Sequence, residues 1–342
     1  MQSNDPTPSG KDTIGDAKRP SVGILILPFM AADDIVAIAR EADRIGYDYC
    51  LVADEGLHAD AYAVLGAVAV ATDNIRIGPM TNGYTRHPGV TATAVATLDD
   101  LSGGRALVTM LAGGSMTLAP LGIERKSPHL VVSEAVEAMR MLWSGETVTW
   151  RGETCTLDRA RLPGSARSIP IWIASRGPKL LTFAGRSADG TLVTVKPDIG
   201  AAFAIVDAAA AAANRLPPVR SYLGRVCYTP QMLEGQRRTL PYVLLDSPRR
   251  VLDALGLDED AIALVARALA GNRPELVEPL ATEDLLRRYQ VAGTPHECAA
   301  ELRTLVANHR LDTLLIDVMA TDLEENLMLL RDSYPILTGR LT

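Results

Sequence analysis

The sequence is poor in the residues that mark several common classes of protein. Only 4% of its residues are aromatic, so a hydrophobic core must be built mainly from Ala, Val, Leu and Ile. The four cysteines are far apart and form no CxxC pair, and the five histidines show no HExxH spacing. We therefore expect neither a disulfide framework nor a metal site, and reduced thiols in a cytoplasmic protein are the simpler interpretation.

The chain also lacks a basic cluster and a long apolar run. Lys and Arg number 34 against 41 Asp and Glu, a formal charge of −7, which disfavours general binding to nucleic acid. The most apolar long segment, residues 200–213, carries Asp207 and is shorter than the ~20 residues that a membrane helix needs. The first residues lack the order of a secretory signal. We expect neither nucleic acid nor a membrane as partner.

The overall composition, with 47% hydrophobic and 22% charged residues, is ordinary for a globular protein and too apolar for a disordered one. A length of 342 residues fits two domains or one α/β barrel. Residues 1–20 are polar and rich in Pro, Gly, Ser and Asp, which predicts a disordered leader. Residues 21–342 are predicted to form a single domain.

Short apolar runs alternate with helical patterns along that domain. The expected strands are residues 22–27, 49–54, 75–81, 106–112, 170–175, 190–195, 220–229 and 313–318. Eight strands, nearly all followed by helices, predict a parallel (β/α)8 TIM barrel with a helical insertion at about residues 230–284. An open doubly wound sheet is the alternative, but the first strand ends in Leu27-Pro28-Phe29-Met30 without the glycines of a dinucleotide loop.

Polar and glycine residues gather where these strands end, which is where barrels place their chemistry. Asp54 and Glu55 follow the second strand, Ala112-Gly113-Gly114 the fourth, Ser175-Arg176-Gly177 the fifth and Lys196 the sixth. The turn at Arg176 leads into a helix whose free N–H groups suit a phosphate, which Lys196 could also reach. Taken singly, these residues have ordinary explanations: a capping acid pair, a tight glycine turn, a solvated lysine. Because all of them are expected on the same rim of the barrel, a shared functional role is favoured over these separate explanations.

Several motifs resemble the bacterial luciferase-like superfamily. They are VADEGLHADAYAVLGAVAVATDNIRIG from residue 52, TNGYTRHPGVTATAVATLDDLSGGR from residue 81 with LAGG after it, PIWIASRGPKLLTFAGRSADG from residue 170, and VAGTPHECAAEL from residue 291. Together they cover about residues 22–335. The ADEG, TNGYTRHP and RGPK segments are most similar to the branch that uses the deazaflavin coenzyme F420, which includes the methylenetetrahydromethanopterin reductases. The other branch uses FMN and oxygen.

The resemblance implies a role for each candidate residue. Asp54 corresponds to an acid near the deazaflavin, and Glu55 stands where relatives place a catalytic His or acid. Gly78-Pro79 falls where the family has a bulge with a cis peptide bond behind the ring, which an X–Pro bond makes less costly. The coenzyme contacts implied for the remaining positions are Thr81, Ala112, Gly113 and Gly114 along the ring and its side chain, and Ser175, Arg176, Gly177 and Lys196 around the phosphate.

The preferred function is that of an oxidoreductase that moves a hydride between F420 and a small organic substrate, with Glu55 as proton donor or acceptor. Reduction of C=N or C=C and oxidation of an alcohol or aldehyde all fit. Glu55 and Gly114 replace the His and Glu of some F420-dependent sugar dehydrogenases, which disfavours a sugar phosphate. A homodimer is expected. The alternatives are an FMN-dependent monooxygenase and a non-catalytic barrel that only binds a flavin or coenzyme.

Overall fold

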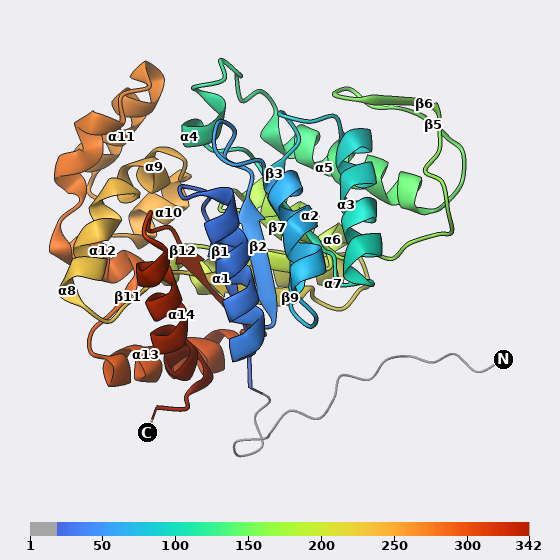
Figure 1. Ribbon diagram of the computed structural model, residues 1–342. Helices are drawn as coiled ribbons and strands as arrows, with labels where there is room; N and C mark the ends of the chain where they lie inside the picture. Colours follow the sequence, from blue (N-terminus) through green and yellow to red (C-terminus); the bar gives the residue numbers. More distant parts are fainter. Residues whose placement is uncertain (1–18, 342) are drawn as a thin grey trace.

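A computed structural model describes residues 19–341, and its central feature is a closed parallel barrel (Figure 1). In order around the barrel, its strands are β1 (Ser21–Ile26), β12 (Thr313–Val318), β9 (Val219–Leu223), β8 (Gly190–Val193), β7 (Ile171–Ala174), β4 (Val108–Leu111), β3 (Arg76–Asn82) and β2 (Tyr49–Ala53). The (β/α)8 prediction is therefore confirmed, and the open sheet is wrong.

Helices surround the barrel. They are α1 (Ala32–Ile45), α2 (Ala61–Ala71), α3 (Pro88–Ser102), α5 (Pro128–Trp143), α6 (Pro178–Ser187), α7 (Ile199–Ala212), α13 (Pro295–His309) and α14 (Leu323–Thr338). Local chemistry sets several of their ends. The Asp60 carboxylate accepts the N–H groups of Tyr62 and Ala63 at the start of α2, and α3 begins at Pro88.

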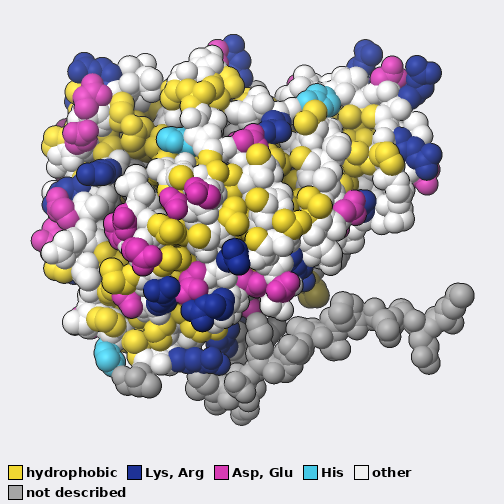
Figure 2. All heavy atoms as spheres, in the orientation of Figure 1, with side chains coloured by type: hydrophobic (Ala, Val, Ile, Leu, Met, Phe, Trp, Pro, Cys, Tyr) yellow, Lys and Arg dark blue, Asp and Glu magenta, His cyan; other side chains and the backbone are white. Residues whose placement is uncertain are grey.

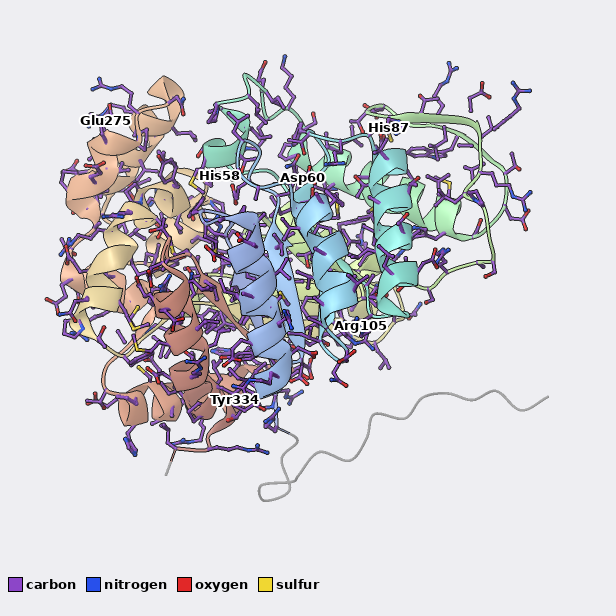
Figure 3. The ribbon with its side chains drawn as sticks, viewed as in Figure 1. His58, Asp60, His87, Arg105, Glu275 and Tyr334 are labelled. Atoms are coloured by element: carbon purple, nitrogen blue, oxygen red, sulfur yellow. The ribbon has the colours of Figure 1, made fainter. Side chains whose placement is uncertain are left out.

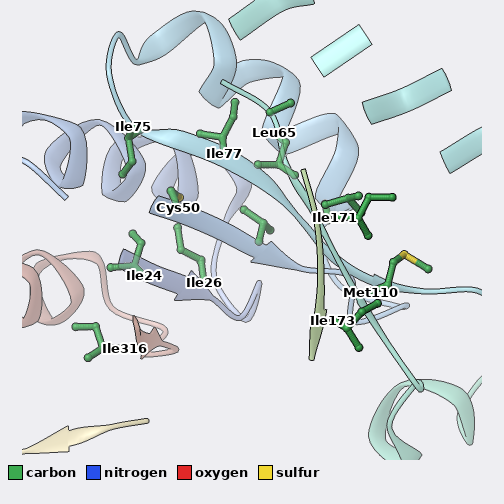
Figure 4. Packing of buried hydrophobic residues seen from close by; sticks show 14 of the residues in the cluster. Ile24, Ile26, Cys50, Leu65, Ile75, Ile77, Met110, Ile171, Ile173 and Ile316 are labelled. Carbon is green, nitrogen blue, oxygen red and sulfur yellow. The ribbon is translucent and has the colours of Figure 1, made fainter. Parts of the chain in front are cut away.

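The barrel strands bury side chains on both faces. Helices cover the outer face, and inward side chains of the strands fill the interior of the barrel. Outward residues of the strands pack against the helices (Figure 4); among them are Ile24, Ile26, Cys50, Ile77, Met110, Ile171, Ile173 and Ile316. Inward residues, including Leu25, Leu51, Leu107, Trp172, Leu192 and Leu315, form a separate interior core. Aliphatic and β-branched side chains thus do the packing that the low aromatic content required.

The predicted seventh strand, residues 220–229, is divided into two. β9 ends at Leu223, and after Gly224 and Arg225 the chain forms β10 (Val226–Cys227), which leaves the barrel to pair with β11 (Val291–Ala292). The helices between β10 and β11 lie on one side of the barrel in Figure 1: α8 (Pro230–Gly235), α9 (Leu240–Leu245), α10 (Arg249–Ala254), α11 (Glu259–Gly271) and α12 (Glu283–Tyr289). We call this segment the insertion; it has its own apolar core around Leu244, Val251 and Leu286.

Two smaller additions complete the fold. The hairpin of β5 (Val148–Arg151) and β6 (Thr156–Ala160) follows α5, and the short helix α4 (Ser115–Leu118) follows β4. The predicted leader lies outside the described residues up to residue 18. Arg19, the first described residue, lies 3.7 Å from the Asp48 carboxylate. None of the helices within residues 19–341 is long and apolar enough to cross a membrane.

Arg105, just before β4, joins the ends of three elements at the end of the barrel opposite His58 and Asp60 (Figure 3). Its guanidinium donates to the carbonyl oxygens of Ala69 (2.9 Å), Thr72 (2.7 Å), Ile75 (2.7 Å) and Ser102 (2.8 Å). These carbonyls come from the end of α2, the approach to β3 and the end of α3. One cation therefore satisfies oxygen atoms that the helix ends leave unpaired.

We expect Arg105→Ala to lower the free energy of unfolding by about 3 kcal/mol, because several buried carbonyls lose a charged donor together. Urea unfolding followed by circular dichroism measures this. Arg140→Ala is the control, since its pair with Asp189 is well exposed and its loss should cost less than about 1 kcal/mol. Equal effects of the two substitutions would contradict the role assigned to Arg105.

Candidate functional site

Asp54 lies at the mouth of the barrel, where the carboxyl ends of the strands meet. Its backbone N–H donates to the carbonyl oxygen of Met80 (2.9 Å), which continues the β2–β3 pairing one residue past the strand. Its carboxylate Oδ2 accepts the hydroxyl of Thr81 (2.7 Å). Thr81 is buried on β3. The structure therefore brings together two of the predicted coenzyme contacts and fixes the Asp54 carboxylate against β3.

Glu55, the next residue, is half-buried, and its side chain points to α4. Its Oε2 accepts the hydroxyl of Thr117 (2.5 Å). Burial raises the pKa of the Glu55 carboxyl, and the negative charges of Asp54 and Asp246 raise it further, while the Thr117 hydroxyl and His58 act in the opposite direction. A carboxyl whose pKa moves toward neutrality at the mouth of a barrel is suited to both donating and accepting a proton.

The β4–α4 loop presents backbone rather than side chains to the mouth. Gly113 has φ +74°, and a Cβ there would come within 2.7 Å of the Leu118 side chain. Only glycine takes this conformation without strain. Gly114 precedes the first residue of α4, and Ala112 is half-buried before it. The loop predicted to line the coenzyme therefore requires glycine at position 113, both for its backbone conformation and for its close packing against Leu118.

The insertion covers this loop through Asp246, at the end of α9. The Asp246 carboxylate accepts the backbone N–H (3.1 Å) and hydroxyl (3.2 Å) of Ser115 and Nη1 of Arg125 (2.9 Å). The same Arg125 nitrogen donates to the Gly113 carbonyl oxygen (3.0 Å). In Figure 1, α4 and α9 accordingly lie together above the strands. Asp246 and Arg125 were not among the predicted site residues, since nothing near them in the chain marks a contact over 121 positions.

Arg176 occupies the predicted phosphate turn, but its side chain points to the insertion. Nη1 donates to the carbonyl oxygen of Val243 (2.8 Å) and the hydroxyl of Ser247 (3.1 Å). The Arg176 carbonyl in turn accepts from Arg250, which also pairs with the buried Asp198. The guanidinium thus holds the insertion to the barrel, and its predicted role as a direct phosphate ligand lacks support from this geometry.

The backbone of the same turn keeps the features that suit an anion. Ser175 Oγ accepts the N–H of Gly177 (3.0 Å), which shapes the turn before α6. Gly177 is the N-cap of α6, and no side chain caps the N–H groups of its first turn. An uncapped helix start carries partial positive charge and free donors.

Lys196 does not join this site, and the prediction that it serves the same anion is wrong. Its Nζ donates to the carbonyl oxygens of Arg287 (2.8 Å) and Gln290 (2.7 Å) and to the Glu301 carboxylate (2.6 Å). The side chain borders an outer hollow of about 500 Å³. The reason is local: β8 stops at Val193, and the short helix η1 (Lys196–Asp198) turns the lysine toward α12 and α13.

The expected cis bond at Gly78-Pro79 is also absent, as the described residues contain no cis peptide bond. Instead, β3 runs straight through this point, with Gly78 beside Leu51 and Pro79 beside Val52 of β2. A Cβ on Gly78 would lie 1.9 Å from the Leu107 carbonyl oxygen, so the glycine permits close approach of β4. Gly78 and Pro79 therefore serve the floor of the site through the backbone of β3.

One mouth thus holds the fixed Asp54 carboxylate, the half-buried Glu55 carboxyl, a glycine loop and an uncapped helix start. Within residues 19–341, no three or more His, Cys, Asp or Glu side chains are grouped to hold a metal ion. Paired acids beside backbone donors at the carboxyl ends of barrel strands define a (β/α)8 enzyme that binds its reactants across the mouth.

Comparisons with known proteins assign the family. The model of the luciferase-like monooxygenase family matches residues 8–312, and the chain belongs to that family. The 5,10-methylenetetrahydromethanopterin reductase of Archaeoglobus fulgidus is 30% identical over 298 residues, which cover 83% of this chain and 89% of the relative. The enzyme of the same name from Methanolobus tindarius is 28% identical over 292 residues, covering 82% and 90%.

Among solved structures, the coenzyme F420 dependent tetrahydromethanopterin reductase from Methanopyrus kandleri superposes with a TM-score of 0.77. It is 25% identical, and the match covers 91% of this chain and 97% of that one. The resemblance drawn from the sequence motifs is therefore confirmed at the level of the family and the fold.

Proposed function

We propose that this protein is an F420-dependent oxidoreductase that transfers a hydride between the deazaflavin and a small organic substrate. The relatives above, which are reductases and include an F420 enzyme, bear out the choice of cofactor and reaction type. The observation that carries the proposal is the half-buried Glu55 carboxyl, which accepts the Thr117 hydroxyl of α4 and follows a second carboxylate, Asp54, that Thr81 holds.

Each part of the mouth has a distinct task in this proposal. The backbone of Gly113 and Gly114 allows a flat ring to lie close to the loop, over the floor that Asp54 and Thr81 fix. The first turn of α6, after Ser175 and Gly177, accepts the phosphate through N–H groups and the helix dipole. When bound, the deazaflavin supplies or accepts the hydride.

Glu55 handles the proton. In the reducing direction, the hydride pair forms the new C–H bond, the C=N or C=C π pair moves to the other atom, and Glu55 gives that atom its proton. In the oxidising direction, Glu55 takes the hydroxyl proton as the hydride leaves carbon. The raised pKa of the carboxyl makes its protonated state easier to populate near neutral pH than that of an exposed glutamate.

Coenzyme binding is the first test. We expect purified protein to quench F420 fluorescence on binding and to bind FMN more weakly. Gly113→Ala should weaken F420 binding by about tenfold, or ~1.4 kcal/mol, because the new Cβ strains the loop. Gly103→Ala is the matched control: its φ of +67° is also left-handed, but a Cβ there meets no atom within 4 Å. Tight FMN binding without F420 binding would instead favour the monooxygenase.

Glu55→Gln tests the proton transfer. A screen of secondary alcohols with F420, and of imines, enones and ketones with reduced F420, first finds a substrate. We expect the variant to bind F420 normally and to lower kcat by roughly 10²–10⁴, with loss of the pH-dependent limb that Glu55 causes. Glu275→Gln, in the insertion, is the control. Full turnover by Glu55→Gln would support a barrel that binds the coenzyme without using this acid.

The same variant has a readout that needs no substrate. The pKa of Glu55 is raised in the folded state, so its stabilising contribution is present below the unfolded pKa and is lost as pH rises through the folded pKa. Glu55→Gln cannot ionise. Its Tm should therefore exceed that of the wild type at pH 8, and the difference should shrink as the pH falls toward the ordinary pKa of glutamate.

We also propose that a second copy of the chain covers the outer faces of α2 and α3. The exposed residues there are Val70, Val90 and Leu101, at 71%, 53% and 49% exposure. Neither α2 nor residues 88–98 of α3 contain a charged residue. In Figure 2, this area shows mostly hydrophobic and uncharged atoms. Two adjacent uncharged helices make a surface suited to a homodimer.

Light scattering coupled to gel filtration tests the dimer. We expect the wild type to have twice the chain mass and Val70→Glu/Leu101→Glu to shift to monomer, since buried like charges repel across a twofold interface. Leu216→Glu is the control, because Leu216 is 85% exposed on a loop after α7. A monomeric wild type, or a control that dissociates equally, would contradict this interface.

The cysteines support a reducing compartment, and we propose the cytoplasm. All four are free, and three of them, Cys50, Cys227 and Cys298, are buried. Burial raises the pKa of the Cys227 thiol to about 12 and that of Cys298 to about 11, which keeps both thiols protonated and unreactive.

A further inference from the structure

Two opposite charges face each other inside the barrel at its upper end. Leu315 of β12 pairs with Leu223 of β9, and two residues further along each segment come Asp317 and Arg225. Asp317 also lies beside Leu25 of β1, a member of the interior core. Side chains alternate along a strand, so Asp317 points inward like Leu315 below it. Arg225 follows the end of β9, and its guanidinium lies beside the Asp317 carboxylate. They form the last interior layer before the mouth.

The pair is close without being hydrogen-bonded. Arg225 Nη1 lies 3.6 Å from Asp317 Oδ2, beyond the 2.7–3.2 Å of an ordinary N–H···O bond. Arg225 Nε and Nη1 and Asp317 Oδ1 are buried and have no hydrogen-bond partner within the described chain. Arg225 is only 7% exposed. Two donors and one acceptor are therefore aimed into the interior with nothing bound to them.

Neighbouring side chains hydrogen-bond the backbone of Arg225 but do not accept from Nε or Nη1 of its guanidinium. Its N–H donates to Gln290 Oε1 (2.8 Å), and Gln290 Nε2 donates to Gln236 Oε1 (2.9 Å). Both glutamines are buried. This chain of amides ties the Gly224–Arg225 break to the insertion. The charged head receives no such support, in contrast to Arg105, whose guanidinium donates to four carbonyl oxygens.

Such a pair is costly to the fold. Buried charges without hydrogen bonds lose hydration that their mutual attraction repays only in part, and apolar residues of similar size often give equal or higher stability. The interior below is filled by leucine, alanine and tryptophan, so an apolar layer was available. The orphaned atoms therefore point to a bound group rather than to packing.

The pair opens on the same mouth as the candidate site. The Asp317 side chain is the more exposed partner, at 18% against 9% for Arg225. The buried phenol of Tyr289 lies in the fields of both Asp317 and Arg176, and Arg176 belongs to the turn after β7. The pair thus stands between the α6 turn and β1, on the side of the mouth away from Gly113.

The opposite charges of Arg225 and Asp317 restrict the kind of ligand that could bind between them. A bound cation would face Arg225 and a bound anion would face Asp317, so each would meet a like charge. A neutral group with a carbonyl next to an N–H satisfies both: the carbonyl accepts from Arg225, and the N–H donates to Asp317 Oδ1. Amides, lactams and ureides have this edge. We propose that Arg225 and Asp317 form a substrate subsite that binds such a neutral amide-type edge.

This inference rests on the proposed function, since it takes the mouth as the reaction site. The test uses 2-pyridone, a small lactam, titrated against F420-loaded protein by saturation-transfer NMR. N-methyl-2-pyridone, which lacks the N–H, and benzoate, an anion, are the comparison probes. We expect 2-pyridone to bind saturably and at least about tenfold more tightly than either.

Arg225→Met/Asp317→Leu should abolish that preference, keep F420 affinity and lose no stability to urea. Arg220→Met/Asp207→Leu removes a partly buried pair elsewhere and should leave 2-pyridone binding unchanged. If the first variant does not fold, Asp317→Asn, which keeps the shape, should still weaken 2-pyridone binding by about tenfold.

Three results would overturn the proposal: equal binding of all probes, unchanged 2-pyridone binding in the variant, or a joint loss of F420 and 2-pyridone binding. A joint loss would mean that Arg225 and Asp317 bind the ring of the coenzyme and not the substrate. Failure of the wild type to bind F420 is a different outcome, which contradicts the proposed function itself.

Discussion

Closure of the sheet is the constraint on which the site depends. β1 pairs with both β2 and β12, which joins the two ends of the chain and leaves no open edge. Because every strand is parallel, closure brings the residues that follow each strand to one rim. Asp54 after β2, Gly113 after β4 and Asp317 at the end of β12 are thereby gathered from positions more than 250 residues apart.

This constraint explains what could be predicted from the sequence. A residue that follows a buried strand must lie at the rim, so Asp54, Glu55 and Gly113 could be placed from strand positions alone. Their local partners are near in the fold as well, as with Thr81 on the neighbouring strand. The barrel itself was readable because both faces of its strands are buried, which gives short apolar runs instead of alternating ones.

What could not be predicted depends on the insertion. Arg176 and Lys196 also follow strands, yet their side chains bind Val243, Ser247 and Glu301, more than 60 positions away. Long flexible cations are directed by whichever carbonyls and carboxylates fold over them, and strand position does not determine that. Arg225 was hidden for a related reason: an expected strand over residues 220–229 concealed the break at which the chain leaves the barrel for the insertion. The one charged residue in the run TLLIDV, Asp317, was the available signal.

Arg176 and Arg125 contribute little free positive charge to the mouth of the barrel. Arg176 and Arg125 lie beside the mouth, but each donates to carbonyls and side chains that link the insertion to the barrel, and Arg125 is neutralised by Asp246. Fixed negative charge remains at Asp54, and Glu55 carries a raised pKa in its presence. The proposed anion contact is therefore the uncapped start of α6, where backbone N–H groups are concentrated. Elsewhere the mouth repels negative charge, which favours a neutral group beside the balanced pair of Arg225 and Asp317. The proposed function accordingly places the coenzyme phosphate at the start of α6 and an uncharged reactant beside Arg225 and Asp317.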